Sequence, residues 1–187
     1  MSLKDLEAFL NDGEESGQSK FDWDKEKKRW LEAVDRLFTD VTSWLEPLSA
    51  NPNFNIRFEK ITLQEEQIGE YETKRMIIEL KGQKAALEPI GTMIIGSRGR
   101  IDLKGSNGTV KFVLVDKRLN KPKVTVNIFT EKEYSQHLAN AQGKPSESTE
   151  PVEYVWKIVT PPPNVQFFPL NEETFSDALL QVIRNGW

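Results

Sequence analysis

The stretch that decides the fold runs from Gly91 to Phe129 and reads GTMIIGSRGRIDLKGSNGTVKFVLVDKRLNKPKVTVNIF. Many of its apolar residues recur at every second position, which is typical of β-strands with one buried face. The spacing predicts three consecutive strands, at about 92–103, 109–115 and 123–129. Asn107-Gly108 lies between the first two, and this dipeptide favours a tight hairpin because both residues tolerate a positive φ.

The same alternation predicts how the hairpin pairs. Ile101 and Leu103 alternate with charged residues on the first strand, and Phe112 and Leu114 lie on one face of the second. A two-residue loop at Asn107-Gly108 places Leu103 opposite Phe112 and Ile101 opposite Leu114. One face of this ribbon is then apolar, and we expect it to form the floor of the core.

Two amphipathic helices are predicted to cover that floor. From Asp22 to about Glu46, apolar residues recur at i, i+3, i+4 and i+7, and the stripe includes Trp30, Leu37 and Val41. We expect this helix to pack across a sheet, with a coiled-coil or partner-binding helix as the alternative. A second apolar stripe follows Asn171, which predicts a capped helix over 172–185.

Further strands are predicted along the rest of the chain. The alternation that begins at Phe54 shifts near Glu59-Lys60, which indicates a bulge or a bend before Leu63. Other strands are expected at 70–81, 85–91 and 152–158, with a short extended piece at 165–170. Pro89 interrupts the strand of 85–91 and predicts an edge position for it. Short helices are predicted at 3–10 and at 130–141.

These elements together predict an α+β fold. We expect a single curved antiparallel sheet, or a partly open roll, of about seven or eight strands, with a long N-terminal helix and a C-terminal helix packed on it. A chain of 187 residues suits one core. Residues 1–20 are expected to form a short helix and a flexible link, and 21–187 a single domain.

Composition narrows the class of protein. The chain is 37% hydrophobic and 29% charged, as in an ordinary soluble globular protein. It contains no cysteine, no apolar run long enough to span a membrane and no visible secretory signal. We therefore expect a cytoplasmic protein without disulfides. Its oligomeric state does not follow from the sequence.

The charge is distributed unevenly. The net charge is −4, yet residues 97–124 contain eight basic and only two acidic residues. The glycines of Gly96-Ser97-Arg98-Gly99-Arg100 permit a backbone cradle for a phosphate or carboxylate, although a simple bend between strands explains them as well. The candidate ligand-binding residues are Arg98, Arg100, Lys104 and Lys111.

Catalytic patterns are sparse. His137 is the single histidine, and no nucleophile elbow, Walker A loop or dinucleotide fingerprint accompanies it. Glu70 and Glu72 share one face of a predicted strand, where paired carboxylates are more typical of a solvated surface than of a glycosidase. We predict neither a cofactor nor a metal ligand, because no motif for either is present.

The sequence thus favours a non-enzymatic binding module that contacts an acidic protein or another anionic ligand through the basic 97–124 region. One alternative is a small hydrolase whose site is assembled from distant strands and includes tyrosines (Tyr71, Tyr134 and Tyr154). Another is a nucleic-acid-binding protein, but Phe112 is the only aromatic residue in the basic region and its alternation directs it into the core.

Overall fold

The computed structural model describes residues 22–92, 97–122 and 152–184. These residues form one seven-stranded antiparallel sheet, in which every strand neighbours the next one along the chain, together with an N-terminal and a C-terminal helix. The predicted α+β fold is confirmed. In chain order the elements are α2 (Trp23–Leu45), η1 (Glu46–Leu48), β1 (Phe54–Glu65), β2 (Gly69–Leu80), β3 (Gln83–Gly91), β4 (Arg100–Gly105), β5 (Gly108–Asp116), β6 (Tyr154–Val159), β7 (Phe167–Pro169) and α4 (Glu172–Ile183).

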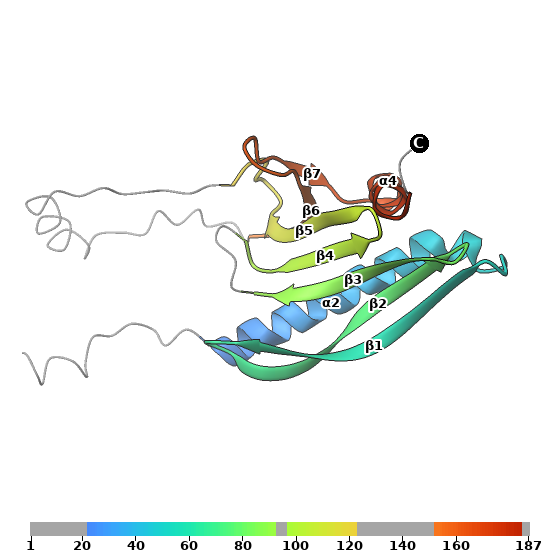
Figure 1. Ribbon diagram of the computed structural model, residues 1–187. Coiled ribbons are helices and arrows are strands. Elements are labelled where there is room, and N and C mark those ends of the chain that lie inside the picture. The colour runs from blue at the N-terminus through green and yellow to red at the C-terminus, as the bar shows by residue number, and fades with distance from the viewer. Residues whose placement is uncertain (1–21, 93–96, 123–151, 185–187) are drawn as a thin grey trace, which may run out of the picture.

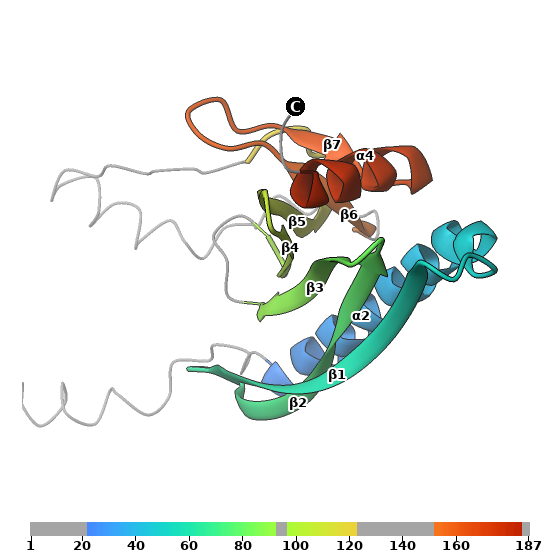
Figure 2. The same ribbon diagram turned by 45° about the vertical axis from the view of Figure 1, so that its right-hand side comes forward.

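Both helices contribute to the core on one face of the sheet (Figure 1). The strands β1 and β2 curve around α2, as Figure 2 shows, and α4 packs on β3, β4 and β5. The two helices meet where the rings of Trp44 and Phe175 lie 5.7 Å apart. None of the described helices is long and apolar enough to cross a membrane.

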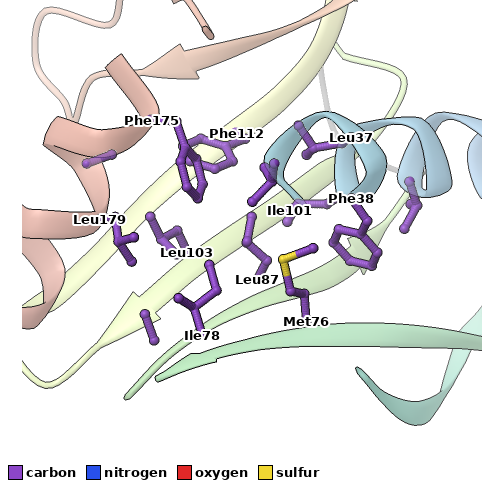
Figure 3. Packing of buried hydrophobic residues seen from close by; sticks show 14 of the residues in the cluster. Leu37, Phe38, Met76, Ile78, Leu87, Ile101, Leu103, Phe112, Phe175 and Leu179 are labelled. Carbon is purple, nitrogen blue, oxygen red and sulfur yellow. The ribbon is translucent and has the colours of Figure 1, made fainter. Parts of the chain in front are cut away.

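The core is a continuous apolar layer between the sheet and the helices. Figure 3 shows Met76, Ile78 and Leu87 pointing from the sheet toward Leu37 and Phe38 of α2. Next to them, Ile101, Leu103 and Phe112 of β4 and β5 meet Phe175 and Leu179 of α4. Removing this apolar surface from water supplies the main stabilising free energy of the fold.

The long helix α2 forms as its periodicity predicts. Trp30, Leu37 and Val41 are almost completely buried on its sheet-facing side. The Asp22 carboxylate accepts a hydrogen bond from the backbone N–H of Lys25 at 3.0 Å and so caps the N-terminus. Burial of the apolar stripe confirms that α2 is a core helix.

The hairpin between β4 and β5 forms, but its predicted register is wrong by two residues. Leu103 lies opposite Val110 and Ile101 opposite Phe112, so the loop residues are Ser106 and Asn107. A shift of two residues keeps every side chain on its predicted face, because side chains alternate with a period of two. The apolar floor is therefore preserved.

Contacts with α4 explain this register. The Asn107 backbone N–H donates to the carbonyl of Val182 at 2.8 Å, and its side-chain amide donates to the carbonyl of Gln181 at 3.0 Å. A Cβ on Gly105 would lie 2.3 Å from that Val182 carbonyl. The glycine therefore permits the close approach that fastens the loop to the C-terminal end of α4.

Two other predictions in the sheet need correction. The strand with Pro89 is not at an edge, because β3 lies between β2 and β4. Its pairing with β2 ends at Leu87, before the proline, and its register with β4 shifts directly after the pair of Pro89 with Ile101, so the sheet becomes irregular where the proline lies. The strand predicted at 92–103 is not continuous, because Thr92 and Arg98 lie in bends and β4 begins at Arg100; residues 93–96 lie outside the described residues.

No bulge forms near Glu59-Lys60, where the sequence predicted an irregularity, but the buried side chains of the strand change there from one set of alternate positions to the other. Pairing between β1 and β2 runs unbroken from Phe54 opposite Leu80 to Glu65 opposite Gly69. The more buried positions nevertheless change from even to odd residues past Phe58. A long two-stranded ribbon twists strongly, and the curvature in Figure 2 follows from this twist.

Several of the predicted elements do not fall in the described part of the chain. The helix and linker of 1–20, the strand of 123–129 and the helix of 130–141 lie outside the described residues. The last helix, α4, forms with a capping box in which Asn171 and Thr174 exchange two hydrogen bonds of 3.0 Å. Its apolar stripe is buried as predicted.

The opposite face of β5–β7 carries a second, smaller apolar cluster. Val113, Val115 and Phe167 form it, and Leu119 and Val165 pack against it. Lys157 is only 6% exposed there, and its ammonium group donates to the carbonyls of Lys117 (2.8 Å) and Leu119 (2.6 Å). These carbonyls satisfy a charge that would otherwise be costly to bury.

Candidate functional site

Three of the four candidate cations lie on the sheet face that the helices leave uncovered. The cross-strand register places Arg100, Lys104 and Lys111 together there. Arg100 donates two hydrogen bonds, of 2.8 and 3.1 Å, to the buried carboxylate of Asp102, and Lys104 donates to Glu88 at 3.0 Å. Lys111 alone of the three is exposed, while the other two are half-buried.

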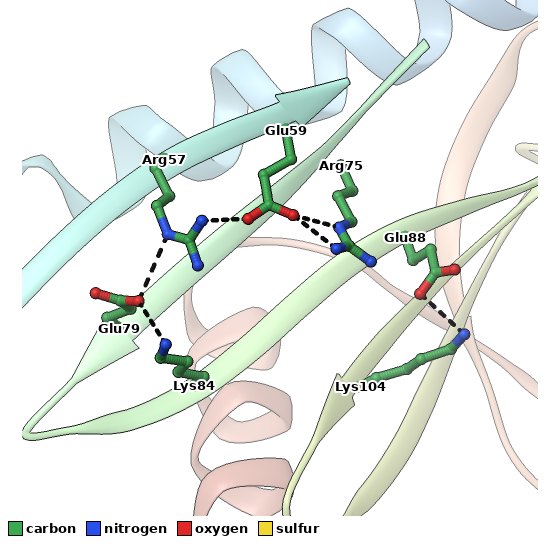
Figure 4. A network of polar contacts seen from close by, with 7 residues as sticks. All are labelled: Arg57, Glu59, Arg75, Glu79, Lys84, Glu88 and Lys104. Atoms are coloured by element: carbon green, nitrogen blue, oxygen red, sulfur yellow. Dashed lines mark hydrogen bonds and ion pairs between the residues drawn. The ribbon is translucent and has the colours of Figure 1, made fainter. Parts of the chain in front are cut away.

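The ion pairs continue across the uncovered face of β1–β3 (Figure 4). Glu59 accepts hydrogen bonds from both Arg57 and Arg75, and Glu79 pairs with Arg57 at 3.5 Å and with Lys84 at 3.4 Å. The hydrogen bond from Arg75 is the main cause that lowers the pKa of Glu59. This face therefore presents charges that are mostly paired with each other.

The fourth candidate, Arg98, lies on the helix-covered side. Its guanidinium donates to the Glu26 carboxylate of α2 at 3.0 Å and covers the Tyr154 ring at 5.3 Å from the centroid. Burial opposes its charge, but the contacts with Glu26 and Tyr154 outweigh burial and raise the pKa of Arg98. The structure thus separates Arg98 from the other three cations.

The neighbouring glycine fixes this position. Gly99 has a φ of +155°, and a Cβ on it would lie 2.3 Å from the Trp30 ring. The backbone here also pairs with β5, because Arg98 N–H donates to the Leu114 carbonyl at 2.8 Å. Gly99 therefore serves tight packing against α2, and the segment that contains it does not open a helix as a phosphate loop would.

A groove of about 810 Å³ opens beside Arg98, between α2 and β6. Trp30, Leu37 and Trp156 form part of its wall, and the exposed side chains of Val152 and Tyr154 line it as well. The Trp30 and Trp156 rings lie 6.0 Å apart. The Trp156 indole N–H donates to the Ala33 carbonyl at 3.1 Å, which joins β6 to α2 along the groove.

The charged groups of the groove carry both signs. Glu26 is only 8% exposed, and its carboxylate is held by Arg98 at 3.0 Å and by Arg29 at 3.7 Å. Arg36 and Asp40, one helical turn apart on α2, are exposed at the groove. Apolar walls with a few polar groups are typical of a peptide or small-molecule site, whereas a phosphate site needs converging donors.

A second polar cluster joins the end of the β1–β2 hairpin to the bend after β3. The Tyr71 hydroxyl donates to Glu65, whose other carboxylate oxygen accepts from the N–H (2.8 Å) and the hydroxyl (2.7 Å) of Thr92. Burial, followed by the hydrogen bond to Glu65, raises the pKa of Tyr71 well above its ordinary value. These contacts fit a structural clamp.

The remaining sequence candidates for chemistry do not converge. Glu70 and Glu72 are exposed, and Glu72 lies 3.9 Å from Lys60. Among the described residues, no three acidic, histidine or cysteine side chains lie close enough together to hold a metal ion. His137 and Tyr134 lie outside the described residues.

The sequence contained part of the signal for the groove. The helical stripe predicted a buried Trp30, and the alternation at 152–158 predicted a shared face for Tyr154 and Trp156. Neither pattern indicates that α2 and β6 lie next to each other, so the groove itself was missed.

Comparison with protein-family models, curated proteins and solved structures finds no match to this chain.

Proposed function

We propose that this chain is a non-enzymatic binding module that takes up a segment of a protein partner in the groove between α2 and β6. The groove itself carries the proposal. It combines a volume of about 810 Å³ with an aromatic wall and an exposed apolar rim at Val152. Aromatic anchors of this kind contribute most of the free energy in many protein interfaces.

We further propose that the partner segment is acidic. Arg98 supports this, because among the described cations of the basic 97–124 region it is the one that lines the groove. Arg36 adds an exposed guanidinium on α2, and a carboxylate of the partner would meet both charge and hydrogen-bond donors there. Arg100 and Lys104 are less suitable, because neither lines the groove and both lie on the uncovered face of the sheet.

An enzyme is the second candidate, because Glu26, Arg98 and Tyr154 meet at the groove. Their contacts favour binding over catalysis. The Glu26 carboxylate is engaged by two arginines, and the guanidinium of Arg98 covers the Tyr154 ring, so the three groups hold α2 and β6 together. A catalytic base is instead expected to be free to meet the proton that it removes.

Nucleic-acid binding has less support, since Trp30 is buried and the guanidinium of Arg98 covers the Tyr154 ring, which leaves little aromatic surface for bases to stack on. A cytoplasmic location remains part of the proposal and rests on the cysteine-free sequence.

A displayed library of random peptides tests this function. We expect selected peptides to combine apolar anchors with Asp or Glu, and Val152→Asp or Arg36→Glu to weaken their binding at least tenfold, because each change places a negative charge at the groove. Lys111→Glu is the matched control, since Lys111 is exposed on the opposite face of the sheet.

The control also separates the alternatives. Selected peptides that lose affinity with Lys111→Glu but not with Val152→Asp would move the site to the uncovered face. Failure to select any peptide that competes at the groove would refute the proposed function.

A further inference from the structure

The strand β1 is an unusually long open edge of the sheet. It has twelve residues, pairs with β2 and, in the described part of the chain, has no further strand on its other side (Figures 1 and 2). Most strands have three to ten residues. Along an edge of this length, the backbone groups that point away from the neighbouring strand can pair with a further chain that aligns with them.

The usual devices that protect an edge are weak in β1. The strand contains no proline, and its pairing with β2 has no bulge. Phe58, in its middle, is 48% exposed, although it touches Phe38 and lies beneath the Lys74 ammonium group at 5.2 Å. The charges beside it have opposite signs, with Arg57 before it and Glu59 after it.

This order of charges makes β1 complementary to itself. In an antiparallel pair of identical strands related by a two-fold axis, residues directly opposite each other lie on the same face of the sheet. With the axis at Phe58, Arg57 of each copy lies opposite Glu59 of the second copy. The two Phe58 side chains then meet on the helix-covered face.

The neighbouring registers are disfavoured by the same charges. An axis at Arg57, at Glu59 or at Lys60 places that residue opposite itself and so sets two like charges against each other. Like charges directly opposite each other destabilise a strand pair. Of the four registers centred on residues 57–60, only the one centred on Phe58 joins opposite charges without such a repulsion.

We propose that two copies of this chain pair through β1, antiparallel and centred on Phe58, to form one continuous sheet. The pairing extends the existing network, because Glu59, which already accepts hydrogen bonds from Arg57 and Arg75 of its own chain, would also face Arg57 of the second copy. The groove lies between α2 and β6 and stays open, so this inference is independent of the proposed function.

Charge reversal with mixing tests the register. Arg57→Glu and Glu59→Arg each replace two attractive pairs by two repulsive ones, and we expect each variant alone to dimerise at least roughly tenfold more weakly than the unaltered chain in analytical ultracentrifugation. Mixing the two variants restores both pairs, since one copy then carries two acidic side chains at these positions and the other copy two basic ones. A variant that merely misfolds is not rescued by mixing.

A cysteine cross-link provides the second measurement. The chain has no cysteine, so Phe58→Cys places a single thiol at the two-fold axis, where cross-strand residues are close enough for a disulfide. We expect rapid formation of a covalent dimer under mild oxidation. Phe168→Cys is the matched control, because Phe168 has a similar exposure of 46% but lies on β7 at the other edge.

The dimer would be disproved by a chain that sediments as a monomer at all concentrations, by variants whose mixing restores nothing, or by a Phe168→Cys chain that cross-links as fast as Phe58→Cys. A monomer whose β1 edge pairs only with a different protein would equally overturn it.

Discussion

In the described part of the chain, α2 and α4 cover one face of the sheet and no helix covers the other face of β1–β4, and the two faces differ in burial and in charge. The covered face buries Leu87, Leu103 and Phe112 almost completely. The open face carries ion pairs such as Arg75 with Glu59 and Lys104 with Glu88. Alternation along the same strands supplies both surfaces.

The contrast shows which surface holds the fold together. Burial of a large apolar side chain contributes about 1.5–3 kcal/mol, whereas an exposed ion pair contributes about 0–1 kcal/mol. Stability is therefore expected to depend on the covered face. The charged residues of the open face are expected to affect the proposed pairing of β1 more than the stability of the fold.

The largest expected difference between the faces is on β5. Phe112→Ala opens a cavity between the sheet and α4 and should lower the free energy of unfolding by about 3–5 kcal/mol. Lys111→Ala, one residue earlier on the open face, should change it by about 0.5 kcal/mol or less. Denaturant unfolding measures both, and equal losses would contradict the comparison.

A smaller effect is expected from the contact between the backbone and α2. Gly99→Ala forces a Cβ into the Trp30 ring at a positive φ and should cost about 1–3 kcal/mol. Gly69→Ala also has a positive φ, of +83°, but meets no atom within 4 Å, so it isolates the backbone strain. If thermal unfolding gives the same loss for both, the Trp30 contact contributes nothing.

Tyr71 tests how burial on the covered side affects a polar group. Its raised pKa means that the protonated phenol is favoured in the folded state. The stability that it contributes is complete below the unfolded pKa of about 10 and is lost as the pH rises from there through the folded pKa. Ultraviolet titration should show one phenol that ionises above its ordinary pH range, and Tyr71→Phe should remove this late step. Ionisation of Tyr71 in the ordinary pH range of a phenol would refute the clamp.

The smallest effect is expected on the open face. Removal of the ion pair by Lys104→Met should change the free energy of unfolding by about 0–1 kcal/mol, since both partners are partly exposed. A double-mutant cycle with Glu88→Gln isolates the coupling, which should weaken as salt is added. A coupling of several kcal/mol would mean that the open face contributes to folding as strongly as the core.

Local sequence patterns predicted most of the elements. The apolar stripe of α2, the Asn171 cap of α4 and the alternation of β5 and β6 each correspond to an element in the structure. These features depend on residues close together in the chain, where the 3.6-residue and two-residue periods determine which side chains share a face.

The candidate site depended on contacts that the local patterns do not contain. The basic residues of 97–124 read as one group in the sequence, and strict alternation would place Arg98 and Arg100 on the same face. The bend at Arg98 and the positive φ of Gly99 break that alternation, so Arg98 lies on one side of the sheet and Arg100 on the other. The groove exists because Trp156 lies against Ala33, 123 residues away along the chain.

The sequence by itself determined that this protein is an antiparallel sheet covered by two amphipathic helices, because hydrophobic periodicity is a local property. Only the tertiary structure decided the register at Asn107, the interior position of β3 and the lining of the groove. Each of these follows from a close approach between distant segments, such as Gly105 against α4 and Gly99 against Trp30. Such approaches depend on which packed surfaces meet, and hydrophobic alternation is compatible with more than one arrangement.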